Sequence, residues 1–98
     1  MPSLKIIAYD LKDATSSDYT KLEEVIKTNF PNNSRKLLNT TWAIEDPRSP
    51  IEVGRVISPF INLSRGDKLL VDHISKDVAV FGFSQIDIGW SRDRLRKP

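Results

Sequence analysis

Residues 4–10 constrain the fold more than any other part of the sequence, because nearly all of them are apolar and the segment ends on a carboxylate. Side chains alternate between two faces along a β-strand. One face of this segment therefore carries Ile6, Ala8 and Asp10, and the other carries Ile7 and Tyr9. Because both faces are apolar, the strand is expected to be covered on both sides, with its aspartate at the rim of a sheet.

The length and composition of the chain indicate a single globular domain. Its 98 residues can bury one modest core. Hydrophobic residues make up 39% of the chain and charged residues 29%, and no run approaches the roughly 18 apolar residues of a membrane span. The absence of cysteine excludes disulfides and thiolate metal sites. Because the N-terminal residues lead directly into the strand, we expect no signal peptide and a cytoplasmic location.

A first helix is predicted after the polar loop that follows the strand. It begins near Ser17, with Ser16 or Ser17 as the N-cap and Asp18 close to the positive end of the helix dipole. Its apolar residues recur at helical spacing on one stripe, namely Tyr19, Leu22, Val25, Ile26 and Phe30. Pro31 ends the helix, because proline cannot continue the hydrogen-bond ladder.

A second helix has a clear start signal. Ser49 is suited to be its N-cap, Pro50 its first helical residue and Glu52 the acidic partner of a capping box. Its apolar side is expected to contain Ile51, Val53, Val56, Ile57, Phe60 and Ile61. Pro59 is expected to kink or interrupt this helix.

The order of the elements predicts a fold class. The remaining strands are expected over four short ranges, 35–38, 41–45, 68–74 and 78–83. The first two are either separate strands or one kinked strand. The resulting order is β-α-β-β-α-β with an extra C-terminal strand, the ferredoxin-like arrangement of an α+β sandwich with both helices on one face of the sheet. We assign residues 1–83 to this domain and residues 84–98 to a basic C-terminal tail.

This architecture leaves one face of the predicted sheet without cover. Two helices cover one face only, so in a monomer the apolar residues of the other face would contact water over a larger patch than monomers usually expose. A second copy related by a two-fold axis covers that face if the sheets pack together or the last strand is exchanged. The sequence therefore predicts a homodimer.

The C-terminal tail is the most basic part of the chain. Against the single acidic residue Asp93, its basic side chains are Arg92, Arg94, Arg96 and Lys97. Residues 91–98 thus have a net charge of +3. Because the whole chain has a net charge of +2, the other ninety residues have a net charge of −1. The four basic residues either bind nucleic-acid phosphates or belong to a solvated terminus. Trp90 beside them either stacks on a base or anchors the tail to its own domain.

Three short motifs carry a resemblance to a known family. They are the strand ending in Tyr9–Asp10–Leu11, the strand beginning Thr40–Thr41–Trp42, and the segment Gly66–Asp67–Lys68–Leu69–Leu70–Val71. Over residues 4–83 the chain resembles the CRISPR-associated protein 2 superfamily, in particular its SinR-like small proteins, with VapD toxins as more distant relatives. The resemblance implies a ferredoxin-like homodimer whose last strand joins the partner's sheet. It also implies either a metal-dependent endonuclease or a protein that binds DNA as a scaffold within the spacer-acquisition complex.

The resemblance assigns a role to Asp10. In nuclease members, the aspartate that ends the first strand faces its mate across the two-fold axis and binds a divalent metal. Asp10 is therefore the candidate catalytic residue and the candidate ligand of Mg²⁺ or Mn²⁺. From the residues alone, Asp10 equally fits a side chain that caps its loop. The following loop keeps an acidic Asp13 but lacks the family's arginine, which favours the alternative of a non-catalytic dimeric adaptor, regulator or toxin–antitoxin component.

Antiparallel topology places further polar residues near Asp10. The end of the first strand should lie beside the starts of the third and fourth strands, which carry Thr40, Thr41, Asp67 and Lys68. Hydroxyl groups at this rim are suited to hold a metal-bound water or a phosphate oxygen. Trp42 is expected in the core or at the dimer seam. His73, the only histidine, is expected to have a structural role, because the sequence shows no evident carboxylate or serine partner for it.

Overall fold

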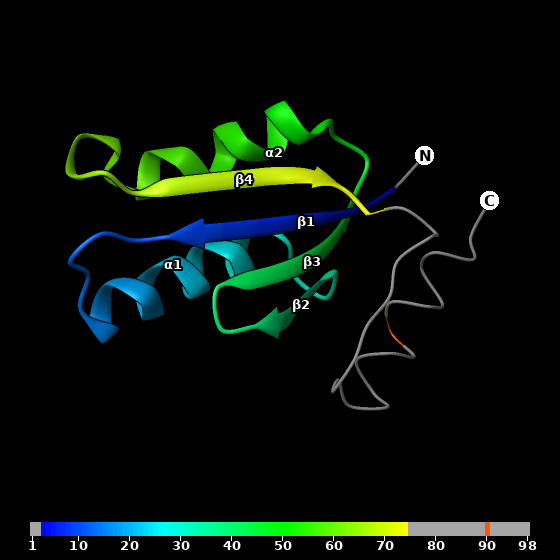
Figure 1. Cartoon of the computed structure of the whole chain (residues 1–98). Helices are drawn as coiled ribbons and strands as arrows, with labels where there is room; N and C mark the ends of the chain where they lie inside the picture. Colours follow the sequence, from blue (N-terminus) through cyan, green and yellow to red (C-terminus); the bar gives the residue numbers. More distant parts are fainter. Residues whose placement is uncertain (1–2, 75–89, 91–98) are drawn as a thin grey trace.

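Four β-strands, two α-helices and two short 3₁₀ turns make up the part of the chain that the computed structural model describes, residues 3–74 and Trp90 (Figure 1). In chain order they are β1 (Ser3–Asp10), α1 (Ser16–Asn29), β2 (Ser34–Leu38), β3 (Thr41–Asp46), α2 (Pro50–Ile57), η1 (Ser58–Phe60), η2 (Leu63–Arg65) and β4 (Lys68–His73). This is the predicted β-α-β-β-α-β order, with β2 and β3 as separate strands. The predicted strand over 78–83 lies outside the described residues, as do the basic tail residues Arg92, Arg94, Arg96 and Lys97.

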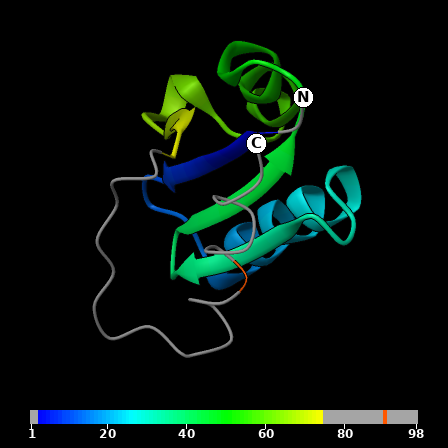
Figure 2. The ribbon, with the colours of Figure 1, turned by 90° about the vertical axis from the view of Figure 1, so that its right-hand side faces the viewer.

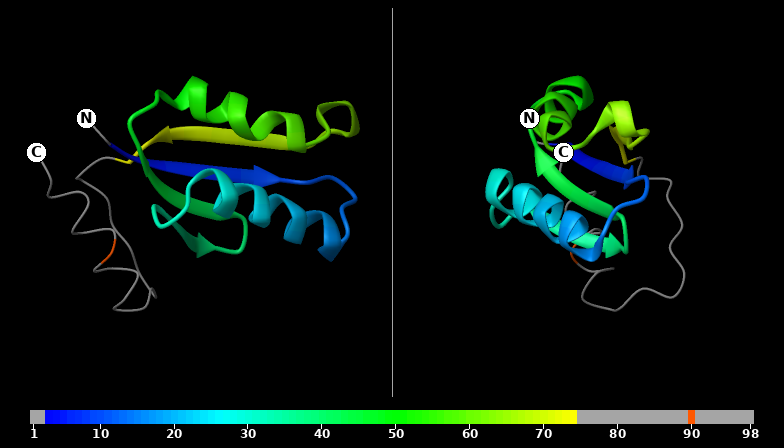
Figure 3. Two further views of the ribbon diagram at one scale, coloured as in Figure 1. Left: turned by 180° about the vertical axis from the view of Figure 1, so that it is seen from behind. Right: turned by 90° about the vertical axis from the view of Figure 1, so that its left-hand side faces the viewer.

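Strand β1 lies inside the sheet, whose order is β2-β3-β1-β4. It pairs antiparallel with β3 on one side and with β4 on the other, and β2 pairs antiparallel with β3. Both helices lie on the same side of the twisted sheet (Figure 2 and Figure 3). The result is a small α+β domain with a four-stranded antiparallel sheet and two helices, compatible with a ferredoxin-like fold. Neither described helix has the length and apolar character needed to cross a membrane.

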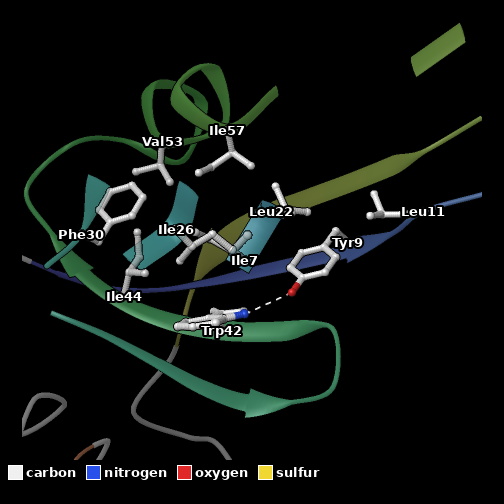
Figure 4. Packing of buried hydrophobic residues seen from close by; sticks show 10 residues of the cluster. All are labelled: Ile7, Tyr9, Leu11, Leu22, Ile26, Phe30, Trp42, Ile44, Val53 and Ile57. Atoms are coloured by element: carbon white, nitrogen blue, oxygen red, sulfur yellow. Dashed lines mark hydrogen bonds between the residues drawn. The ribbon is translucent and has the colours of Figure 1, made fainter. Parts of the chain in front are cut away.

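The hydrophobic core fills the space between the sheet and the two helices (Figure 4). Ile7 of β1 and Ile44 of β3 are fully buried on the helix side of the sheet. The helices contribute the buried residues Leu22, Ile26, Val53 and Ile57. Trp42 belongs to this core, and its indole Nε1 donates a hydrogen bond of 3.1 Å to the hydroxyl oxygen of Tyr9. The bond matters because a buried indole N–H without an acceptor is costly.

Helix α1 begins slightly earlier than predicted. Its N-cap is Thr15 and not Ser16 or Ser17. The Thr15 Oγ1 accepts a hydrogen bond of 3.2 Å from the backbone N–H of Asp18, and the Thr15 N–H donates one of 3.0 Å to Asp18 Oδ2. This reciprocal capping box needs an acidic residue three positions after the cap, a spacing to Asp18 that Thr15 has and the two serines lack.

Helix α2 starts as its sequence signals predict, and it ends before Pro59, so it is shorter than the predicted run of apolar residues. Ser49 is the N-cap, and Glu52 completes the capping box with it. The helix ends at Ile57, and Pro59 lies in the following 3₁₀ turn η1. Proline therefore interrupts the helix at this point, because its ring removes a backbone donor and clashes with the preceding turn.

Two of the residues predicted on the apolar side of α2 are exposed instead. Ile51 and Phe60 keep 67% and 58% of their surface. Ile51 lies roughly 200° around the helix from the buried Val53, because successive residues are about 100° apart. Phe60 follows the end of α2, so the helical spacing no longer fixes its direction. The prediction was wrong for these two side chains, whereas Val53 and Ile57 are buried as expected.

Lys5 is a buried charged residue that the apolar pattern of the first strand did not predict. Its side chain has no exposed surface, and it occupies the same face of β1 as Ile7. The ammonium Nζ donates a hydrogen bond of 2.7 Å to the backbone carbonyl of Asp46. Burial lowers the pKa of Lys5, and the nearby Asp46 carboxylate partly offsets this effect. The helix side of β1 is therefore not wholly apolar.

Gly54 and Gly66 form a pair of positions at which alanine should have opposite effects. In α2, a Cβ at Gly54 would lie 3.9 Å from Val71 Cγ2, an ordinary van der Waals contact. Gly66 has φ +106°, and a Cβ there would lie 3.3 Å from Lys12 Cδ. We expect Gly54→Ala to raise the free energy of unfolding by about 0.5–1 kcal/mol. Gly66→Ala should lower it by about 1–2 kcal/mol. Urea denaturation of the two variants beside the wild type measures both changes, and effects of the same sign would contradict this account.

Candidate functional site

The rim where β1 ends and β4 begins brings together most of the polar residues singled out in the sequence. Asp10 and Lys68 lie directly opposite each other on the antiparallel ladder, so their side chains share one face of the sheet. Thr41 of β3 pairs with the β1 residue two positions before Asp10. The backbone N–H of Tyr9 donates a hydrogen bond of 3.1 Å to the carbonyl oxygen of Thr40. The predicted neighbourhood of Asp10, Lys68 and the two threonines is confirmed.

The face of the sheet opposite the helices is called the open face below. On β1 and β4 it carries Leu4, Ile6, Ala8, Asp10, Lys68, Leu70 and Asp72, because the alternate residues pack into the core, and of these Leu4, at the end away from the rim, is buried. A shallow hollow of about 390 Å³ lies at its rim end and is lined by Ala8, Tyr9, Asp10, Lys68, Leu69 and Leu70. Asp10 and Lys68 are exposed, and Leu70 keeps 62% of its surface. The candidate site is thus an open, mainly apolar hollow with one carboxylate and one ammonium group at its edge.

Asp67 lies next to this rim, but its carboxylate is not free to bind a ligand. The side chain has no exposed surface. It accepts hydrogen bonds of 2.8 Å from the backbone N–H groups of Lys12 and Asn62. It also accepts two from the Arg65 guanidinium, 3.0 Å from Nε and 2.8 Å from Nη2. These donors, Arg65 first among them, hold the pKa of the Asp67 carboxyl well below its usual range. Asp67 is therefore a structural residue.

The bonds to Asp67, called the Asp67 clamp below, join separate parts of the chain. Lys12 belongs to the β1–α1 loop, whereas Asn62 and Arg65 belong to the connection between α2 and β4. Arg65 also reaches α1, where its Nη1 lies 3.7 Å from Asp18 Oδ2. The clamp therefore fixes the backbone that follows Asp10 against the backbone that precedes Lys68.

The sequence analysis did not predict this clamp. Its local signal is the spacing of Arg65 and Asp67, which lie two positions apart and form a bidentate ion pair. The contact between Lys12 and Asp67 spans 55 positions of sequence, so it depends on the folded arrangement of β1 and β4. No local pattern could have revealed that contact.

Asp10 supplies a single carboxylate at the position predicted to bind a divalent metal. Its exposed carboxylate supplies the hard oxygen ligands that Mg²⁺ and Mn²⁺ prefer. Within residues 3–74 and Trp90, no group of three or more His, Cys, Asp or Glu side chains could hold a metal ion. The exposed Asp13 follows in the β1–α1 loop, with a positive φ of 51°. A metal at Asp10 would therefore take its remaining ligands from water, a substrate or a second copy of the chain.

His73 lies at the opposite end of β4 from the rim. It lies five positions along the strand from Lys68, about 17 Å at the usual rise of an extended chain. The side chain is exposed, and the backbone N–H donates a hydrogen bond of 2.8 Å to Asp72 Oδ1. His73 is therefore not placed to share a reacting group with Asp10.

Comparison with known proteins gives information on the fold. No family model matches the chain, and no curated protein matches it. A solved structure described as a hypothetical protein, TT1823 from Thermus thermophilus, is similar with a TM-score of 0.64. The two sequences are 19% identical, and the match covers 84% of this chain and 93% of that chain. At this identity the similarity supports the α+β fold and carries no information on activity.

The Asp67 clamp should make stability depend on pH in the acid range. Because the folded state lowers the pKa of Asp67, the ionised carboxylate stabilises the fold above its unfolded pKa of about 4. That contribution is lost as the pH falls towards the folded pKa. We expect Asp67→Asn to lower the melting temperature at pH 7 and to show a smaller further decrease between pH 5 and about 2 than the wild type. Thermal denaturation across this range tests the expectation, with Asp10→Asn as the control at an exposed position. Parallel curves for Asp67→Asn and wild type would contradict it.

Proposed function

We propose that this chain is a homodimeric nucleic-acid-binding protein of the CRISPR-associated protein 2 type, with metal-dependent phosphodiester cleavage at the rim where the Asp10 residues of two copies meet. The observation that carries the proposal is the position of Asp10. It is an exposed carboxylate at the end of an inner strand, on the open face of the sheet and beside Lys68.

The two faces of the sheet support the dimer. The helices pack against one face, whereas the open face presents Leu70 and Leu38 with 62% and 53% of their surfaces exposed. Ile6 and Ala8, on the inner strand β1, are partly exposed on the same face. A second copy with its own open face would remove these apolar surfaces from water. It would also supply the second Asp10 that one chain lacks.

The residues at the rim suit a divalent metal and a phosphate. Two Asp10 carboxylates from two copies would give the one or two acidic ligands that Mg²⁺ usually takes from a protein, with waters completing its shell. Such a metal supplies Lewis-acid chemistry, which activates water and stabilises negative charge on a phosphate. The Lys68 ammonium, exposed beside Asp10, supplies a positive charge for the same phosphate. The tail residues Arg92, Arg94, Arg96 and Lys97 remain the predicted contacts to the nucleic-acid backbone.

A second candidate function is a non-catalytic dimeric adaptor, regulator or toxin–antitoxin component. The observation that favours it is the pairing of Asp10 with Lys68 across the β1–β4 ladder, because an adjacent ammonium group competes with a metal for the carboxylate. The same open face would then serve protein contacts. This alternative keeps the homodimer and removes the reaction.

A cleavage assay separates the two candidates. Purified wild type and Asp10→Asn are incubated with labelled single- and double-stranded DNA and RNA in Mg²⁺, Mn²⁺ or EDTA. We expect cleavage that requires metal and falls by roughly 100-fold or more in Asp10→Asn, because the metal ligand is lost. Asp72→Asn is the matched control, since it changes a carboxylate on the same face at the other end of β4.

Light scattering on the same samples shows whether each variant keeps the oligomeric state of the wild type. Equal cleavage by wild type and Asp10→Asn would assign the activity to another site or a contaminant. Absence of cleavage by either protein, with the dimer intact, would favour the adaptor.

A further inference from the structure

The rim end of the open face contains two cross-strand pairs, and the two members of each pair differ in charge or in size. Asp10 of β1 lies opposite Lys68 of β4, so a negative charge neighbours a positive one. Ala8 lies opposite Leu70, so a small side chain neighbours a large one. Among the residues that the structure describes, neither Asp10 nor Lys68 forms an ion pair. Both charges are exposed, and Leu70 stands 62% exposed beside the hollow.

This arrangement is complementary to itself under one particular symmetry. A two-fold axis that runs parallel to the strands, between two stacked sheets, places β1 of one copy over β4 of the other. Each Asp10 then faces a Lys68, and each Leu70 faces an Ala8. Opposite charges meet opposite charges, and the large side chain meets the small one, as an isologous interface requires.

A two-fold axis perpendicular to the strands, at the level of the Ala8–Leu70 pair, gives a poorer match. It would stack Leu70 on Leu70 and Ala8 on Ala8, so that large meets large and small meets small. It would place Lys68 over Asp72, an opposite charge, but it would also place the Asp10 carboxylate over Ile6, against an apolar side chain. An unpaired carboxylate in such a contact is costly. Only the axis parallel to the strands gives both charged residues of the rim, Asp10 and Lys68, a partner of opposite charge, so the pattern on the open face favours that axis.

We infer that two copies of this chain pack through the rim ends of their open faces, with each Asp10 paired to Lys68 of the partner subunit and each Leu70 seated over Ala8 of the partner subunit. The inference rests on the homodimer of the proposed function and adds the residues that join the two copies. The shallow hollow of about 390 Å³, which Ala8 and Leu70 help to line, receives the partner's Leu70.

The contact is confined to the rim end of the sheet. Farther along the strands, Ile6 lies opposite Asp72, and under the same axis an apolar side chain would face a carboxylate. Sheets twist, so two stacked sheets that meet closely at one end diverge at the other. Divergence leaves Asp72 in water, which agrees with its exposed position at the far end of β4.

The arrangement also defines the electrostatics of the Asp10 site. Two carboxylates and two ammonium groups gather near the axis, and their charges cancel. A divalent cation that binds Asp10 must displace Lys68 of the partner subunit from the carboxylate. Lys68 is thus the residue that sets how readily the site accepts a metal, in addition to joining the two copies.

Charge reversal tests the pairing directly. In Asp10→Lys, two lysines would face each other in each half of the interface, and in Lys68→Asp, two aspartates would. We expect each variant alone to dimerise at least 10-fold more weakly than the wild type at low salt, because like charges would oppose each other. An equimolar mixture of the two variants restores both opposite-charge contacts, so a heterodimer of about wild-type affinity should form.

Sedimentation velocity over a range of protein concentrations measures these affinities, with one variant carrying a fluorescent label to identify the heterodimer. Circular dichroism checks that each variant is folded, and the exposed position of both residues makes this the expected result. Asp72→Lys is the matched control, because it reverses a charge on the same face away from the contact. It should leave the dimer affinity within about 2-fold of wild type.

The outcomes separate this inference from the proposed function. Restoration of the dimer in the mixture, with two weakened single variants, supports the pairing of Asp10 with Lys68. A wild-type dimer that both single variants retain, or that the mixture fails to restore, overturns the pairing and leaves the homodimer standing. A wild type that stays monomeric at all concentrations overturns both.

Discussion

The candidate site depends on one buried carboxylate, that of Asp67. Its oxygens accept hydrogen bonds from the backbone N–H groups of Lys12 and Asn62 and from Nε and Nη2 of the Arg65 guanidinium. A buried ion pair adds little net stability by itself, but removal of one partner leaves several groups without bonds. The loop after β1 and the loop before β4 share this anchor. The hydrogen bonds of Asp67 therefore restrict the backbone next to Asp10 and Lys68.

The sheet divides the molecule into two unlike halves. On the helix side, the apolar side chains pack together in the core. The buried Trp42 donates a hydrogen bond to Tyr9, and the buried Lys5 donates one to the backbone carbonyl of Asp46. On the open face, apolar and charged side chains alternate near the rim without a cover from the helices. This asymmetry is the structural basis of the homodimer that we propose. One side supplies the stability of the single domain, and the other supplies the surface on which its proposed function depends.

Within residues 3–74, local sequence signals predicted each helix and strand, and the features that they did not predict depend on long-range contacts. The capping box of Ser49 and Glu52 and the spacing of Leu22 and Ile26 are local, so both helices were found, with the start of α1 displaced to Thr15. The burial of Lys5 depends on a carbonyl 41 positions away.

For the site, topology alone predicted the neighbourhood of Asp10 and Lys68. The register that sets them directly opposite each other, and the withdrawal of Asp67 from solvent, required the folded arrangement.

The burial of Lys5 has a consequence for the chemistry of the chain. Acylating reagents attack amines that are deprotonated and accessible, and the Lys5 side chain has no exposed surface while the domain is intact. Its modification must wait until this part of the sheet opens. The rate at which Lys5 is acylated therefore reports how often this part of the core opens. The measurement needs no ligand, and Lys5 lies away from the rim.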